Sequence, residues 1–522
     1  MTTIPSSLLG TLNTSATVQQ SNTPLSAPAG SSPASSSNTD TASTRVTLQT
    51  LSIETESLTY AKPASSSTIW ETASDDEVTS RMAKNFQGGT LFSRFQGLGQ
   101  TLLARFNTDG GNFSQSVMRP SLGQTQPDAS LAKVAQQVLH AAADNQIALN
   151  ITTRSGAKVA ITLGSSTEGL AAQIDVTGGT LTDGERKALA SLADGFQQAI
   201  NGLSGDTPTL DLGGLTQFDT SILTSVDLHA TLKDASGKTQ TVDFHADARQ
   251  RTLSAQMLTG AVNVSVDTSK LSQLGSASQQ AQAISTYLKQ FDDAQARGHG
   301  DKTLMALFKD AFSQMITTGG SSGKQPDNTI ALNDTARSIL TGLADFSASL
   351  TQAAKSVNPM RPGEVDKFSY QASQKTEITG RDQDNYTVTQ QQQSHLVASY
   401  HTTLSGTDGP LMLTGEKKSQ NYFYYQIEDS ASSQSQLSYS KGKLVMAMLS
   451  QSASQNTHMV KYILGELVED VTTPQHGASS LDLLGMLKSL DALSLQDDER
   501  QRTLDRISRQ VLLQPNPAQM KD

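Results

Sequence analysis

Residues 146–165 have the sequence QIALNITTRSGAKVAITLGS, and this stretch decides the fold that we predict. Apolar residues take every second position on both sides of the central RSG, which is the period of strands with one buried face. If the two apolar sets share a face, Ile151 lies opposite Val159 and residues 154–156 form a three-residue loop ending in Gly156. Glycine suits that position because it adopts the left-handed conformation without steric cost. The stretch therefore predicts a β-hairpin.

A third alternating segment and a capped helix follow the hairpin. Residues 170–176 keep the period of two, and the apolar spacing then changes to three and four residues. Thr182 and Glu185 have the spacing of a capping box, in which each side chain accepts a hydrogen bond from the other residue's amide. We therefore expect a helix over residues 182–203 whose apolar stripe packs on the sheet, formed by Leu189, Leu192, Phe196, Ile200 and Leu203.

The strand pattern returns further along the chain. Residues 226–232 and 242–246 alternate, and the loop 235–237 between them again ends in glycine. Two more alternating segments, 253–257 and 262–266, complete a unit with a mostly antiparallel sheet. The fold class that we predict is α+β, multidomain, with mostly antiparallel sheets and packed amphipathic helices.

Changes of composition and period divide the chain into six predicted segments. Apolar stripes predict helices at 90–107, 276–297, 302–317 and 329–356, and another helix at Leu131, Val134, Val138 and Leu139. The predicted division is a disordered Ser/Thr/Pro-rich tail at 1–75, a helical segment at 76–125, an α+β domain at 126–270, a helical region at 271–357, a polar β-rich region at 358–475 and a C-terminal helical hairpin at 476–522.

Composition excludes several kinds of protein. The 522 residues carry a formal charge of −10 and no block of Lys or Arg, which argues against nucleic acid as a partner. No cysteine is present, so disulfides and cysteine nucleophiles are excluded. Neither a conventional secretory signal nor an apolar run long enough for a membrane span occurs. These features favour either a cytoplasmic protein or export without a cleaved leader.

The first 45 residues are dense in Ser, Thr, Pro, Ala and Asn, with only Asp40 and Arg45 charged. Such a segment buries too little apolar surface to fold, so we expect disorder, and a short strand or docking segment at 46–60. A linker explains this composition, and so does the leaderless type III export signal that it resembles. Flagellar hook-length regulators also have a Ser/Gln/Thr-rich N-terminal region and a globular C-terminal region. The C-terminal motif of that family is not matched here, so we do not assign the chain to it.

One cluster of side chains suggests chemistry. The expected register of the second hairpin puts Asp227 opposite His245 and His229 opposite Asp243, with Asp247 one step further, all on the polar face. Converging imidazoles and carboxylates can bind a metal ion. Opposite charges across neighbouring strands are also ordinary sheet stabilisers worth roughly 0.2–1 kcal/mol. We favour the second interpretation, with no metal or cofactor, and keep Asp227, His229, Asp243 and His245 as candidate metal ligands.

The sequence contains no phosphate loop, dinucleotide fingerprint, nucleophile elbow, zincin helix or calcium loop. We therefore expect a non-enzymatic interaction or structural protein with a protein partner, exported by a leaderless route to a surface or secretion-apparatus setting. Two alternatives stay open: a metal-dependent enzyme that uses the Asp/His face of the second hairpin, and a cytoplasmic scaffold.

Overall fold

The computed structural model describes residues 68–120, 129–205, 207–234, 236–270, 275–317, 330–405, 411–492 and 497–520, all within one compact unit, Ala64–Asp522. The predictions for the tail at 1–45 and for the segment at 46–60 lie outside these residues. Residues 68–75, which we assigned to the tail, are partly ordered. Ile69 and Trp70 form a short strand that pairs with Met118 and Val117.

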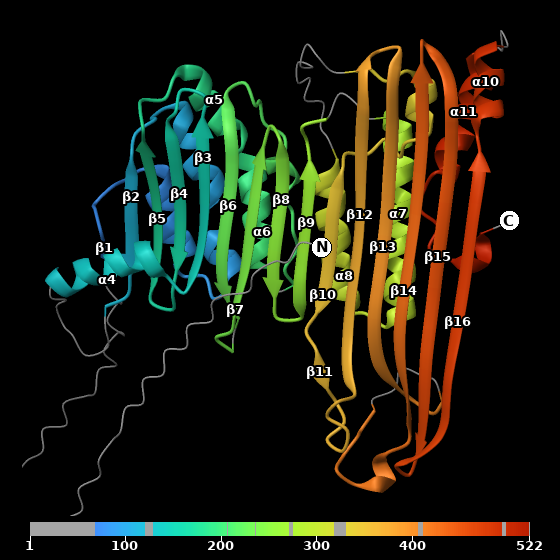
Figure 1. Cartoon of the computed structure of the whole chain (residues 1–522). Helices are drawn as coiled ribbons and strands as arrows, with labels where there is room; N and C mark the ends of the chain where they lie inside the picture. The colour runs from blue at the N-terminus through green and yellow to red at the C-terminus, as the bar shows by residue number, and fades with distance from the viewer. Residues whose placement is uncertain are drawn as a thin grey trace, which may run out of the picture. The chain divides into compact units, whose positions relative to one another are not determined.

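One antiparallel sheet runs through the described residues (Figure 1). Its strand order is β1-β2-β5-β4-β3-β6-β7-β8-β9-β10-β12-β13-β14-β15-β16, with β11 paired to β12. The strands are β1 (Ile69–Trp70), β2 (Phe113–Met118), β3 (Asn145–Thr153), β4 (Lys158–Ser165), β5 (Gly169–Thr177), β6 (Leu223–Lys233), β7 (Thr239–Asp247), β8 (Gln250–Met257), β9 (Gly260–Asp267), β10 (Phe346–Gln352), β11 (Lys355–Ser356), β12 (Val365–Asp382), β13 (Asn385–Thr403), β14 (Tyr422–Ser440), β15 (Lys443–Ile463) and β16 (Glu466–Asp482).

The α+β prediction is confirmed. The sheet crosses the predicted boundaries at 270 and 357, because β9 pairs with β10 and β10 pairs with β12. Whether the predicted segments fold on their own stays a prediction. The helices are α1 (Glu77–Asn85), α2 (Leu91–Phe95), α3 (Leu98–Ala104), α4 (Ala129–Ala142), α5 (Asp183–Ser191), α6 (Ala193–Ser204), α7 (Ala277–Gly298), α8 (Lys302–Ile316), α9 (Asp334–Ser338), α10 (Leu484–Ala492) and α11 (Asp497–Gln510).

The first hairpin and its helix form as their residues dictate. Ile151 pairs with Val159, and Gly156 has a φ of 94°. The capping box is present, with the Thr182 amide donating to Glu185 Oε2 at 2.9 Å and the Glu185 amide donating to Thr182 Oγ1 at 3.3 Å. Burial opposes ionisation of Glu185, but its hydrogen bonds prevail and lower its pKa to about 2. The helix breaks at Leu192 and continues as α6.

The core lies between the sheet and most of the helices. The predicted stripe is buried, and Phe196 and Ile200 are fully enclosed. Helix α3 approaches α6 closely at Gly99, where a Cβ atom would lie 2.9 Å from Cδ1 of Phe196. Further along, α7 and α8 bring Phe291, Phe308 and other aromatic rings against β10 and β12. These contacts cover one face of the sheet with apolar side chains.

Two helix predictions are wrong in detail. Residues 329–356 do not form one long helix; α9 is short, and β10 follows it. Helix α9 ends at Ser338, Gly342 beyond it has a φ of 80°, and Phe346, Ala348 and Leu350 are then buried at the strand period of two. The predicted helix at 90–107 is divided into α2 and α3 by Gly97, which has a φ of 71°. Strand β2 was not predicted within the helical segment 76–125.

Helix α4 exposes most of the apolar stripe that predicted it. Leu139 is buried, whereas Leu131, Val134 and Val138 are each more than half exposed. In the part of the chain that the structure describes, no helix has the length and apolarity that crossing a membrane requires.

In the C-terminal region, residues 365–482 contribute β12 to β16, so β16 runs past the predicted boundary at 475. Helices α10 and α11 follow β16, and whether they form a separate hairpin stays a prediction. The run Gln390–Gln393 divides between the two faces of the sheet. Gln391 and Gln393 are exposed, but Gln390 and Gln392 are buried on the helix-covered face.

Candidate functional site

The second face of the sheet is the candidate site, and strand alternation separates it from the helix-covered face. In β12, Tyr370 and Ala372 are buried towards the helices, and the alternating residues Gln371 and Ser373 point the other way. The second face is hollowed at neighbouring places, with volumes of about 770 Å³ over β10 to β16, about 460 Å³ over β6 to β9 and about 400 Å³ over β9 to β13, the last bordered by Lys375. Ser347 lines all three hollows, so they adjoin at β10.

Polar residues cross this face in two adjacent rows, in which each member is the register partner of the next. Row one passes from Asn150 on β3 to Ser452 on β15, and row two from His229 on β6 to His476 on β16. Row one consists of Asn150, Asp227, His245, Thr252, Ser265, Ser347, Ser373, Gln393, Ser432 and Ser452. Row two consists of His229, Asp243, Ser254, Asn263, Ser349, Gln371, His395, Ser430, Ser454 and His476.

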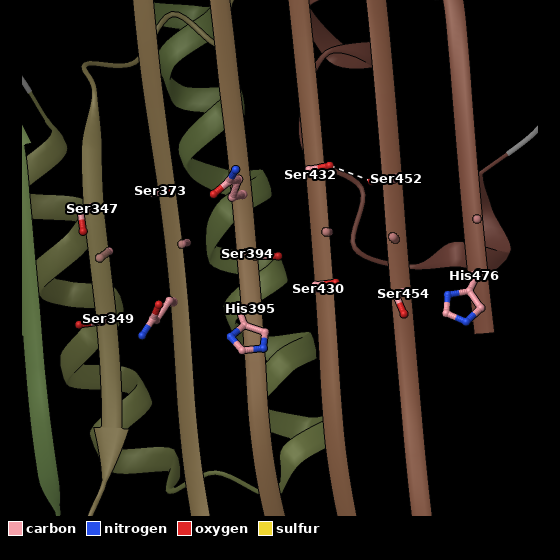
Figure 2. A pocket seen from close by; sticks show the side chains of 17 residues that line it. Ser347, Ser349, Ser373, Ser394, His395, Ser430, Ser432, Ser452, Ser454 and His476 are labelled. Atoms are coloured by element: carbon pink, nitrogen blue, oxygen red, sulfur yellow. Dashed lines mark hydrogen bonds between the residues drawn. The ribbon is translucent and has the colours of Figure 1, made fainter. Parts of the chain in front are cut away.

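These two polar rows are long and shallow. Row one crosses ten neighbouring strands, which is roughly 40 Å at about 4.8 Å per strand. Figure 2 shows the C-terminal half of both rows. In row one, the hydroxyls of Ser432 and Ser452 are hydrogen-bonded at 2.8 Å. In row two, the rings of His395 and His476 lie on either side of Ser430 and Ser454. The helices lie behind the strands in this view (Figure 2).

The predicted Asp/His cluster lies at the other end of the same rows. The register is as predicted, and Nδ1 of His245 is 2.6 Å from Oδ1 of Asp227 while Nδ1 of His229 is 2.6 Å from Oδ1 of Asp243. Nε2 of His245 also lies 3.4 Å from Oδ2 of Asp247. The structure thus joins these five residues as two separate cross-strand pairs, one of them extended by Asp247.

Electrostatics favour the charged form of His245. Burial lowers the pKa of the His245 imidazole, but the hydrogen bond and charge of Asp227, and then those of Asp247, outweigh it and raise the pKa above the ordinary value of 6.5. The pKa of the Asp247 carboxyl shifts in the opposite direction. Burial raises the pKa of its carboxyl, but amide hydrogen bonds from Arg249 and Gln250 and contact with His245 lower it.

The geometry bears on metal binding and on nucleophilic catalysis. Over the described ranges, no group of three or more His, Cys, Asp or Glu residues is arranged to hold a metal ion. A serine nucleophile needs a base within hydrogen-bond reach. His395 faces Ser430, and its Nε2 lies 3.9 Å from Oε1 of Glu428, a distance too long for a hydrogen bond that would orient the ring.

The rows combine uncharged hydrogen-bonding groups over β8 to β16 with two Asp–His pairs on β6 and β7. Hydroxyl, amide and imidazole groups donate and accept, and the row members include no Lys, Arg, Phe, Tyr or Trp. A nucleic-acid site needs cations for the phosphates, and single strands usually also stack on aromatic rings. The rows therefore suit a polar protein surface better than a nucleic acid.

The sequence pattern indicated only the N-terminal end of this surface. The half over β10 to β16 was missed because its Ser and Gln residues, taken singly, have no distinctive chemistry. A signal exists in the alternation of Ser347 and Ser349 on one strand and Gln371 and Ser373 on the next. It becomes a site only when the register of successive strand pairs aligns the polar residues of six strands.

The histidines show how far the polar face extends. His401, buried to 1% side-chain exposure, has its Nδ1 2.6 Å from Oδ1 of Asp366 and its Nε2 3.3 Å from Oε2 of Glu364. Tyr422 donates to the same Glu364 oxygen at 2.6 Å. This enclosed cluster fixes the chain beside β12 and ends the open part of the face.

Comparison with known proteins adds no relative: no protein-family model, curated protein or solved structure matches this chain.

Proposed function

We propose that this chain is a non-enzymatic binding protein and that a protein partner docks on the two polar rows. One observation carries the proposal: a sheet whose first face is covered by helices leaves a second face with about 40 Å of continuous hydrogen-bonding side chains. Solvated faces of antiparallel sheets are common. A face hollowed at adjoining places and lined by polar groups from eleven strands is better suited to contact with a second molecule.

The composition of the rows supports a protein as the partner. About ten direct hydrogen bonds and a similar number of bridging waters are usual in protein interfaces, and the rows offer donors and acceptors at every strand. Six of the row members near β13 to β16 are serines or histidines, whose short or planar side chains lose little conformational entropy on contact. Each row member also lies on a strand that pairs with a neighbouring strand on both sides, except His476 on the edge strand β16.

The setting of this binding protein is a second part of the proposal. The uncharged front of the chain supports leaderless export to a surface or secretion apparatus, and a cytoplasmic scaffold is the alternative. A reporter fused behind residues 1–75 distinguishes the two. Export through an active type III apparatus supports the first setting, and complete retention favours the second.

The docking test uses site-specific photocrosslinking in the organism that makes the protein. A photoreactive phenylalanine replaces Gln371, which is exposed on row two, and in a matched control replaces Ser285, which is exposed on α7. We expect a discrete protein adduct from position 371 and none from position 285. Adducts of equal yield at both positions, or a glycan adduct in place of a protein, would contradict a protein partner on the rows.

A substitution then tests whether the contact depends on the rows. Ser430→Arg places a long cation in the middle of row two, while Ser285→Arg adds the same charge to α7. Loss of the adduct in the first variant alone supports docking on the rows, provided that both variants keep the thermal stability of the parent chain.

A further inference from the structure

A further hollow lies on the helix-covered side, at the end of the sheet where β6 and β8 finish and β9 begins. Its walls come from α2, the end of α6, the ends of β6 and β8, and the start of α8, and its volume is about 900 Å³. We call it the α2–α8 groove. It lies within the range of roughly 300–1,000 Å³ that is typical of small-molecule sites. It shares no lining residue with the two polar rows.

The floor of the groove is apolar. Leu203, Leu232, Leu304 and Leu307 contribute to it and are each at least nine-tenths buried in the protein, and Met257 lies beside them. The inner end continues as a small void between Leu203, Leu232 and Met257. Such a floor favours a flexible hydrocarbon chain, because it offers dispersion contacts and few hydrogen-bonding groups.

One wall carries a cation that no carboxylate neutralises by direct contact. Arg94 donates through Nε to the Gly88 carbonyl and through its Nη atoms to the turn Ser165–Gly169, including the Ser166 and Thr167 carbonyls. Among the described residues it forms no salt bridge. Burial, and then the charge of Arg119, lower the pKa of the Arg94 guanidinium, and the nearby charge of Glu168 offsets this only in part, so the positive charge is held at a cost in the folded protein.

The other cation of the groove is already neutralised. Nζ of Lys233 lies 2.8 Å from Oδ1 of Asp144. The groove is also lined by Asp234, whose carboxylate accepts from Ser236 Oγ and from the Lys238 amide in its own loop. The cation without a salt bridge in the described part of the groove is therefore Arg94, at the α2 end of the wall beside the apolar floor.

We propose that the α2–α8 groove binds a single-chain anionic amphiphile of the fatty-acid class, with its chain on the leucine floor and its carboxylate near Arg94. The argument for this occupant is charge complementarity combined with the apolar floor. A carboxylate would offset the charge of Arg94 and accept from its Nη2 atom, which has one recorded acceptor, the Thr167 carbonyl. This site is separate from the proposed protein-binding rows and does not depend on them.

Calorimetric titration of the full chain with sodium decanoate tests the proposal, with decyltrimethylammonium and 1-decanol as cationic and neutral probes of equal chain length. We expect saturable binding of decanoate and binding weaker by about tenfold or more for the cation. The variant Thr303→Trp, at an exposed position of the groove wall, should block decanoate, and Ser285→Trp on α7 should not.

Arg94→Gln tests the charge. It should weaken decanoate by roughly tenfold and leave decanol unchanged. If this variant does not fold, the comparison of decanoate with the cationic probe on the parent chain decides the same point. Absence of saturable decanoate binding, binding that Thr303→Trp leaves intact, or equal affinity for the anionic and cationic probes would overturn the proposal.

Discussion

The Nδ1 atom of His245 lies 2.6 Å from Oδ1 of Asp227, its direct register partner on the neighbouring strand. The two residues are also members of row one, which continues from His245 over seven further strands to Ser452. This contact therefore stabilises the hairpin, and its two residues also form part of the surface that we propose as a binding site.

The protonation of His245 predicts how stability depends on pH. Its folded pKa is raised above 6.5. The contribution to stability is therefore complete below the unfolded pKa and is lost as pH rises through the folded pKa. Urea unfolding of the parent chain and of His245→Gln, at about pH 5.5 and about pH 8.5, measures this. The parent should lose its advantage over the variant at the higher pH, and an advantage that grows with pH would contradict the assignment.

Zinc addition decides between pairing and metal binding at the hairpin. If Asp227, His229, Asp243 and His245 only pair across strands, zinc should leave the melting temperature unchanged, and His245→Ala should cost less than about 1 kcal/mol. A metal at 100 times its dissociation constant would add about 2.7 kcal/mol. A zinc-dependent rise in melting temperature that His245→Ala abolishes would favour the metal-dependent enzyme and count against our function.

Burial of α6 makes Phe196 a test of the core. Phe196→Ala should destabilise the protein by about 3–5 kcal/mol, because the ring is fully buried and Ile200 and α3 surround it. Lys187→Ala on the exposed side of α5 should cost less than about 0.5 kcal/mol. Chemical denaturation of both variants gives the comparison, and similar small losses would mean that the helix does not pack on the sheet.

Gln392 connects the sheet to the C-terminal segment. Its Nε2 donates to the Val511 carbonyl at 2.8 Å, and its Oε1 accepts from the Leu513 amide at 3.0 Å and from Tyr287 Oη at 3.1 Å. Gln392→Leu leaves the Leu513 amide and the Tyr287 hydroxyl unpaired at about 1–3 kcal/mol each, while the Val511 carbonyl still accepts from Ser433 Oγ at 2.9 Å, so the variant should lose more than about 2 kcal/mol. Gln393→Leu, exposed on the other face, serves as the control, and equal losses in denaturation would refute the role of Gln392.

The sequence predicts local structure well and the binding surface poorly, for physical reasons. Alternation and turn glycines fix the pairing of Ile151 with Val159, because a slip by one residue would turn every apolar side chain to solvent. The same rule sets His245 opposite Asp227. The pairing of β10 with β9 depends on residues about 80 positions apart, which no local pattern encodes. The helical spacing of apolar residues in 329–356 also predicted a helix where β10 forms.

The buried glutamines illustrate a second limit. Gln390 and Gln392 alternate with exposed glutamines of the same type, so residue chemistry does not tell which face is covered. Only the position of α7 and the C-terminal segment decides it. For the same reason, the serines of row two could not be recognised as a surface before the register of β12 to β16 was known.

The central claim is that one face of the sheet is covered and the other is open to a partner. Because the chain has no cysteine, single cysteines can report this directly. Gln371→Cys lies on row two, and Ala372→Cys, the next residue, lies under the helices at 2% exposure. In the native protein, maleimide should label position 371 at the rate of the denatured chain and position 372 only after unfolding. Equal labelling of the two positions in the native protein would contradict the account.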